Sequence, residues 1–165
     1  MSGKYYDDLV VGAQYRHSTG RTVTEADNVL FCALTMNPQA LHLNEDFAAQ
    51  TEFKHRIVNG IFTMGLIVGL SVSDLTDGTI VGNLGYDSVN HPRPVYQGDT
   101  VYAETEILDK RDSRSRPDCG IVKLRQIGRN QRDEIVITLE RNVLFLKRPV
   151  SGNSPINNAP VADRS

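Results

Sequence analysis

The feature that most constrains the fold is a change of hydrophobic period at Thr79. Upstream of it, Asn59 or Gly60 is expected to begin a long helix that is apolar nearly all round, and such a helix has to be buried. Its apolar residues are Ile61, Phe62, Met64, Leu66, Ile67, Val68, Leu70, Val72 and Leu75. From Thr79 onward, apolar and polar residues alternate, which is the period of strands with one buried face.

Four long strands are expected after this change, at residues 79–90, 99–110, 119–130 and 134–147. In the clearest of them, one face carries Val101, Ala103, Thr105 and Ile107, and the other carries Tyr102, Glu104 and Glu106. Polar turns separate the strands. An antiparallel sheet wrapped around one long central helix is the hot-dog fold, an α+β architecture. Gly65 and Gly69 are then expected to let the helix pack tightly against the curved sheet.

The length of 165 residues fits one domain, which we place at residues 1–150. Residues 151–165 lose all periodicity, so a disordered tail is expected there. Two cysteines, Cys32 and Cys119, lie far apart without metal-ligand spacing and without a signal peptide ahead of them, which indicates a reducing, cytoplasmic location. The apolar run at residues 61–72 is shorter than the roughly 20 residues that span a bilayer.

Smaller elements are expected before the central helix. Residues 14–17 and 21–23 read as extended pieces, and Thr24 begins a helix with carboxylates in its first turn. Pro38 cannot continue that helix. A second short helix is expected at residues 44–50, capped by Asn44. His42 is therefore expected on a loop between two helices.

The block at residues 37–44, Asn-Pro-Gln-Ala-Leu-His-Leu-Asn, is followed at residues 58–60 by Val-Asn-Gly. These segments resemble the signature of the MaoC-like hydratases, or R-specific enoyl-CoA hydratases. In that family, Asp-x-Asn-Pro-x-His-x-Asp precedes a Val-His-Gly helix start, and the two patterns superpose here without a gap. The resemblance covers residues 8–148 and implies the same hot-dog fold independently.

The resemblance also implies roles for individual residues. Asn37 falls on the catalytic aspartate, His42 on the catalytic histidine, and Gly60 on the glycine whose N–H binds the thioester oxygen. Gln39 and Asn59 lie within these motifs and are expected to contact the substrate. Family members add water across the double bond of a trans-2-enoyl-CoA thioester. A histidine suits the proton transfer, and a helix N-terminus suits the thioester oxygen.

Asn37 departs from the family pattern because an amide cannot act as a general base. Three explanations stay open. His42 works alone while Asn37 and Gln39 orient the water, a nearby carboxylate substitutes, or the chain has lost hydration and kept acyl-CoA binding. The candidate carboxylates are Asp27, Glu45 and Asp46, although ordinary first-turn positions in helices explain them better.

Such departures, together with the Ser-Arg-Ser-Arg-Pro turn at residues 113–117, resemble the branch of the family that includes mesaconyl-CoA hydratases. The acyl group of their substrate carries a second carboxylate. Arg56 and Arg93 flank the motif segments and are candidates to bind it, because arginine binds carboxylates bidentately. In the basic cluster at residues 110–116, Arg114 and Arg116 are expected to hold coenzyme A phosphates, with a solvated turn as the alternative.

The sequence thus predicts a hydratase or dehydratase of coenzyme A thioesters that works as a homodimer or a dimer of dimers. No metal or other cofactor is expected, and the mixed charge, −2 in total, favours neither nucleic acid nor membrane as a partner. Two rivals stay open. One is a hot-dog thioesterase, which would need a carboxylate on or near the central helix, where Asp74 lies near the far end. The other is a catalytically silent acyl-CoA-binding protein.

Overall fold

The computed structural model describes residues 3–149, so the tail predicted at residues 151–165 lies outside the described residues. Four long antiparallel strands dominate it, and each begins and ends within two residues of its predicted bounds. They are β3 (Ile80–Asn90), β4 (Thr100–Asp112), β5 (Cys119–Arg129) and β6 (Ile135–Leu146). The two predicted extended pieces are the short strands β1 (Gln14–Arg16) and β2 (Arg21–Thr22).

The sheet has the strand order β1-β4-β5-β6-β3, and β2 pairs separately with β4. Although β3 comes directly before β4 in the chain, it lies at the opposite edge of the sheet from β1 and pairs with β6. The alternation predicted for β4 is confirmed, because Val101, Ala103, Thr105 and Ile107 are all buried. One edge of the sheet is therefore a long strand, β3, which has a neighbour on one side only.

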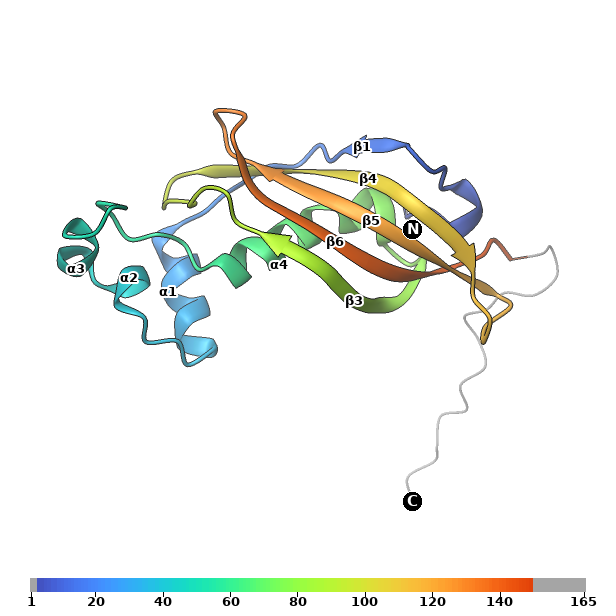
Figure 1. Ribbon diagram of the computed structural model, residues 1–165, viewed down its shortest axis with the longest axis horizontal. Helices are drawn as coiled ribbons and strands as arrows, with labels where there is room; N and C mark the ends of the chain where they lie inside the picture. Colours follow the sequence, from blue (N-terminus) through green and yellow to red (C-terminus); the bar gives the residue numbers. More distant parts are fainter. Residues whose placement is uncertain (1–2, 150–165) are drawn as a thin grey trace, which may run out of the picture.

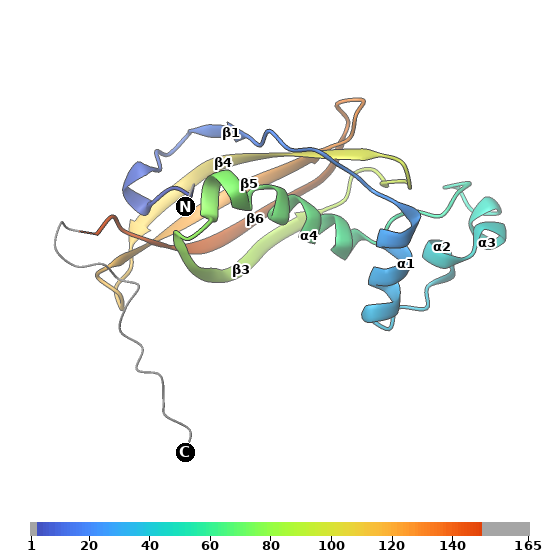
Figure 2. The same ribbon diagram turned by 180° about the vertical axis from the view of Figure 1, so that it is seen from behind.

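The central helix, α4 (Gly60–Leu70), lies along one face of the sheet, as Figures 1 and 2 show. Thr63 and Ile67 are its buried residues, and Ile67 packs into the core together with residues of β4 and β6. The helix was expected to reach Leu75, but it ends at Leu70 and continues into η2 (Val72–Thr76), one turn of wider π-helix. A curved antiparallel sheet around one central helix is the hot-dog fold that the sequence predicts.

The opposite face of α4 is open to solvent. Ile61 is 63% exposed, and Gly65 and Gly69, which follow it at four-residue spacing, are exposed as well. A side-chain Cβ at either glycine would meet nothing within 4 Å. The expectation that these glycines pack tightly against the sheet was wrong, because a single sheet covers only one face of the helix. Full burial of α4 needs a cover from outside the described chain.

Three short helices gather at the N-terminal end of α4, as Figure 1 shows: α1 (Glu25–Leu34), α2 (Ala40–Leu43) and α3 (Glu45–Ala49). A short 3₁₀ turn, η1 (Tyr6–Asp8), precedes β1. Thr24 caps α1 and Asn44 caps α3, which confirms both predicted helix starts. His42 lies in α2 and not on a loop, because its backbone N–H bonds to the carbonyl of Gln39 and closes a helical turn.

Candidate active site

His42 is half-buried in α2 with its imidazole held in one orientation. Its Nδ1 lies 2.9 Å from the carbonyl oxygen of Ile57. A carbonyl oxygen only accepts, so Nδ1 carries the hydrogen and Nε2 of the neutral ring is left with a free lone pair. The ring is therefore set as a base beside the segment that leads into α4.

Asn28 ties His42 to the start of α4. Its side chain is fully buried in α1, and its Nδ2 donates to the carbonyl oxygen of His42 at 3.1 Å. Its Oδ1 accepts from the N–H of Asn59 at 2.9 Å. The sequence reading missed this residue. The available signal was the place of Asn28 in the sequence, directly before the apolar stripe of the predicted helix.

The start of α4 offers a free backbone donor. The side chain of Asn59, itself buried, caps the helix by accepting from the N–H of Ile61 at 2.9 Å. Within residues 3–149, the N–H of Gly60 has no acceptor. A free N–H at a helix N-terminus attracts a developing negative charge. The geometry agrees with the oxyanion role predicted for Gly60, whereas the side chain of Asn59 is engaged in the cap.

His91, directly after β3, stands against Gly60. A Cβ built on Gly60 would lie 3.1 Å from Cε1, 3.2 Å from Nε2 and 3.5 Å from Nδ1 of His91. The loop after β3 reaches this position because the N–H of Val58 bonds to the carbonyl of Val95 at 2.8 Å. The sequence reading missed His91, and no local spacing could have indicated it. Desolvation lowers the pKa of the His91 imidazole, although the residue as a whole is exposed to solvent.

Asn37 and Gln39 form the turn between α1 and α2. The side-chain Oδ1 of Asn37 accepts from the backbone N–H of Gln39 at 3.0 Å, and the backbone N–H of Asn37 donates to the carbonyl of Cys32 at 2.9 Å. The Asn37 side chain is half-buried, and the Gln39 side chain is exposed. The carbonyl oxygen of the Asn37 amide therefore uses one lone pair to hold the turn, and its other lone pair and its NH₂ group are left for a water or a substrate. Substrate contact by Gln39 stays a prediction.

Two of the three carboxylates considered as substitutes for the family aspartate, Asp27 and Glu45, are engaged elsewhere. Asp27 accepts from the N–H of Thr24 at 2.8 Å, and this bond holds the pKa of the Asp27 carboxyl below its ordinary value. The pKa of Glu45 is also lowered, first by the hydrogen bond from His55 and then by those from Arg56. A carboxylate with a lowered pKa is a weaker base, so neither is suited to take a proton from water.

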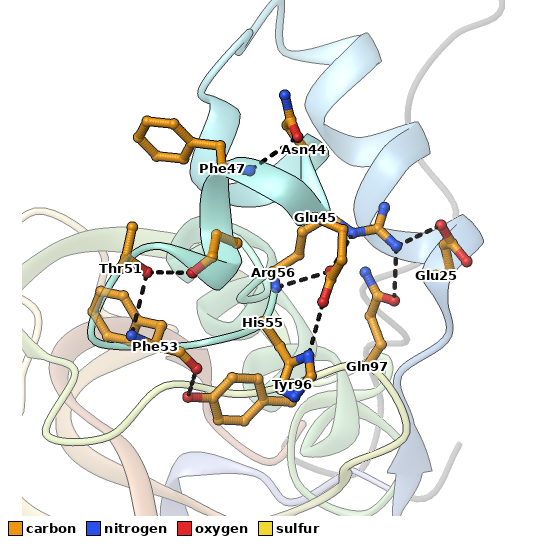
Figure 3. Close-up of polar contacts among 11 residues, drawn as sticks. Glu25, Asn44, Glu45, Phe47, Thr51, Phe53, His55, Arg56, Tyr96 and Gln97 are labelled. Atoms are coloured by element: carbon orange, nitrogen blue, oxygen red, sulfur yellow. Dashed lines mark hydrogen bonds and ion pairs between the residues drawn. The ribbon is translucent and has the colours of Figure 1, made fainter.

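Arg56 lies between two of these helices, as Figure 3 shows. Its Nε donates to Glu45 at 3.0 Å and its Nη2 to Glu25 at 2.8 Å, and its side chain is only 16% exposed. The guanidinium joins α1 to α3. Binding of a substrate carboxylate by Arg56 stays a prediction. To bind one, Arg56 would first have to release Glu25 or Glu45.

The other predicted arginines lie in two places. Arg93 follows His91 by two residues, and its mostly exposed side chain makes only a long contact, 3.7 Å, with Glu134. Arg114 and Arg116 lie in the β4–β5 hairpin, at the opposite end of the sheet from α1, α2 and α3 in Figure 1. Arg116 pairs with Asp118 at 3.0 Å, and Arg114 lines a surface hollow of about 550 Å³. Within one chain, the hairpin therefore lies far from the short helices, and the roles of Arg93, Arg114 and Arg116 in substrate binding stay predictions.

An apolar groove of about 490 Å³ runs between α1 and the open face of α4. Phe31 and Phe62 meet edge to face in it, with ring centroids 5.7 Å apart. The exposed glycines Gly65 and Gly69 line the groove further along the helix, followed by Leu70. The first residue of α4 that lines the groove, Phe62, is two residues beyond Gly60 in the chain.

Comparison with protein families matches residues 8–130 to the family described as the MaoC like domain. The chain belongs to the MaoC-like family. The family match covers the turn with Asn37 and His42, the start of α4 and His91.

Individual relatives of this MaoC-like chain carry enzyme names. It is 29% identical to a mesaconyl-CoA hydratase of Cereibacter sphaeroides, over 96% of this chain and 46% of that protein. It is 35% identical to an (R)-specific enoyl-CoA hydratase of Rhodospirillum rubrum, over 62% of this chain and 69% of that protein. The chain thus spans less than half the length of the mesaconyl-CoA hydratase.

A solved structure supports the fold of this MaoC-like chain. The crystal structure of the MaoC-like dehydratase from Rhodospirillum rubrum superposes with a TM-score of 0.79 at 30% identity. The superposition covers 90% of this chain and 100% of that one.

Two further properties concern the described part of this MaoC-like chain. Residues 3–149 contain no cluster of His, Cys, Asp and Glu side chains that could hold a metal ion. No helix in the same range has the length and hydropathy to cross a membrane. Cys32 and Cys119 are both buried and unpaired.

Proposed function

We propose that this chain is a hydratase or dehydratase that adds or removes water across the 2,3 double bond of an enoyl-CoA thioester. The observation that carries the proposal is the joining, through Asn28, of a histidine with a free Nε2 to a helix start with a free N–H. The names of relatives at 29% and 35% identity support the same chemistry. Coenzyme A would enter as part of the substrate, and no other cofactor is proposed.

The geometry supports separate roles for Gly60 and His42 in hydration. The thioester oxygen would accept the N–H of Gly60, at the positive end of the α4 dipole. Nε2 of His42 would take a proton from water as the water oxygen bonds to the β-carbon. Negative charge then moves to the thioester oxygen, where Gly60 stabilises it. A proton must finally reach the α-carbon, and the amide of Asn37 cannot supply it.

The groove beside α4 would hold the acyl chain. A thioester whose oxygen lies at Gly60 would have to extend its chain round α4 to reach Phe62 and the groove. The width left by Gly65 and Gly69 favours a chain that lies along the helix. Arg93, exposed and two residues after His91, is the cation that we propose for a second carboxylate on the substrate, which would replace its long contact with Glu134.

We also infer that the active form contains two copies of the chain. The edge strand β3, which pairs only with β6, provides apolar side chains, with Val81 46%, Leu84 54% and Tyr86 41% exposed. An exposed apolar edge strand is a template for pairing. Two copies would also match the length of the mesaconyl-CoA hydratase, of which one chain spans 46%.

The oligomeric state can be tested by light scattering. The wild-type protein is expected at twice the chain mass of 18.3 kDa. If dimers pair further, it is expected at four times the chain mass. Leu84→Lys should yield monomer, because a charge on the edge strand blocks pairing. Leu34→Lys, at an exposed position on α1, serves as the control. A monomeric wild type would exclude the dimer.

One set of assays separates the proposed function from its rivals. A hydratase removes the enoyl absorbance without releasing thiol, a thioesterase releases thiol, and a silent protein only binds. The carboxylate of Asp74 accepts from Nδ1 of the buried His17 at 2.7 Å, so it is already engaged, which disfavours the thioesterase. Simple and dicarboxylic enoyl-CoA substrates should be compared. Thiol release without enoyl loss, or binding alone, would overturn the proposal. The cytoplasmic location stays a prediction.

A further inference from the structure

We propose that His91 is a second catalytic acid and base of this site, which transfers the proton at the α-carbon while His42 serves the water. The inference rests on the proposed function, because it names a further residue for that reaction.

The position of His91 carries the inference. Its Nε2 and Cε1 lie 3.2 and 3.1 Å from the point where a Cβ of Gly60 would be. The ring therefore stands beside the residue whose N–H is proposed to bind the thioester oxygen. In a thioester, the α-carbon is bonded directly to the carbonyl carbon, so a group beside the oxyanion donor is within reach of the α-carbon and its hydrogens.

Among residues 3–149, both ring nitrogens of His91 lack a hydrogen-bond partner, whereas each other histidine has at least one bonded nitrogen. His17 is bonded through Nδ1 and Nε2, His42 through Nδ1 to Ile57, and His55 through Nδ1 to Glu45. Neither nitrogen of His91 has a hydrogen-bond partner among residues 3–149. Of the four histidines in the sequence, His91 alone has both nitrogens available. Its exposed edge also lets protons exchange with solvent.

The protonation state of His91 fits the role. Desolvation lowers the pKa of its imidazole, so the neutral form, which accepts a proton, predominates near neutral pH. Asn37 occupies the family's carboxylate position and cannot accept a proton there. The site is then left with two imidazoles at the two ends of the reacting bond.

The proton balance in dehydration is as follows. Neutral His91 accepts a proton from the α-carbon, and the electrons of that C–H bond form the enolate held by Gly60. As the enolate collapses, the double bond forms and the C–O bond at the β-carbon breaks. His42, protonated at the start, gives its Nε2 proton to the departing hydroxide, which leaves as water. Solvent then removes the proton from His91 and returns one to His42. Hydration follows the same steps in reverse.

The test compares His91→Phe with His91→Ala. Phenylalanine keeps an aromatic ring against Gly60 and has no nitrogen, so both variants should lose about 100- to 10,000-fold in hydration rate if the nitrogens matter. Added imidazole should restore part of the activity of His91→Ala, because the vacated position is open to solvent. His55→Phe, at an exposed histidine outside the site, is the matched control. Thermal unfolding verifies that each variant is folded.

The outcomes separate this inference from the proposed function. A wild type that hydrates no enoyl-CoA overturns the proposed function and the role of His91 with it. An active wild type with a His91→Phe variant within a few-fold of it overturns only the role of His91, and leaves packing as its function. The same holds if imidazole restores nothing to His91→Ala.

Discussion

The Nδ1 of His42 lies 2.9 Å from the carbonyl oxygen of Ile57, three residues before Gly60. The bond fixes the tautomer of the histidine through the same segment that presents the proposed oxyanion donor. Because both proposed catalytic groups depend on one stretch of backbone, a change that shifts this segment should affect the proposed base and the proposed donor together.

Removal of the imidazole gives the first prediction. His42→Gln should lower hydration of trans-2-enoyl-CoA by about 100- to 10,000-fold, the usual loss for a general acid or base. Folding should be retained, because α2 is held mainly by backbone bonds. Steady-state rates measure the effect, with His55→Gln as the control at an exposed histidine. A His42→Gln rate within a few-fold of wild type would remove His42 from the mechanism.

The second prediction compares two substitutions of Gly60. Gly60→Pro removes the N–H, while Gly60→Ala keeps it and adds a Cβ at the same place beside His91. The backbone tolerates proline, since it is the first helical residue and Asn59 already has φ −59° and ψ 129°. The proline variant should lose about 100- to 1,000-fold more in kcat than the alanine variant, the effect of one missing oxyanion donor. Equal rates would exclude the N–H as that donor.

Asn28→Ala is the third prediction. The change deletes both bonds of the buried amide and leaves the N–H of Asn59 and the carbonyl of His42 without partners. The free energy of unfolding should fall by about 2 kcal/mol, as for other unsatisfied buried groups. Urea unfolding measures it. Asn142→Ala, which deletes an exposed bond to Asp87, should change stability by less than about 0.5 kcal/mol. Equal effects would show that Asn28 does not hold the two segments.

The fourth prediction concerns Asn37→Asp. An aspartate oxygen can still accept from the N–H of Gln39, so the turn should be kept. The new carboxylate beside His42 restores a general base and should raise hydration of simple trans-2-enoyl-CoA thioesters. Its charge should repel a substrate that carries its own carboxylate and lower activity on mesaconyl-type thioesters. Unchanged rates on both substrate classes would show that position 37 does not face the reacting atoms.

The fifth prediction follows from the lowered pKa of Glu45. Hydrogen bonds from His55 and Arg56 hold the pKa of Glu45 below its ordinary value of 4.5. A carboxyl with a lower pKa in the folded state stabilises the fold above that ordinary value, and the contribution is lost as the pH falls through the folded pKa. Between about pH 5 and pH 3, wild type should therefore lose more stability than Glu45→Gln, as urea midpoints would show. Parallel losses would indicate that Glu45 does not couple α3 to Arg56.

The sequence predicted the strands and the start of the central helix because their signals are local. Alternation along β4 marks its buried face, and Thr24 and Asn44 mark helix starts through bonds to residues three positions away. The end of α4 was misplaced, since the apolar pattern continues through the π-helical turn. His42 and Gly60 could be proposed from the sequence because they lie within short, ordered motifs.

The sequence by itself thus determined the long strands, the start of the central helix and the family, and it pointed to His42 and Gly60 as candidate site residues. Only the tertiary structure decided that Asn28 joins them, that Arg56 is occupied by Glu25 and Glu45, and that His91 stands against Gly60. These contacts join residues that are far apart in the chain, and they depend on how helices and loops pack. A local hydrophobic period or helix propensity does not predict a contact between distant residues. Such a contact contributes free energy only after both segments have folded against each other.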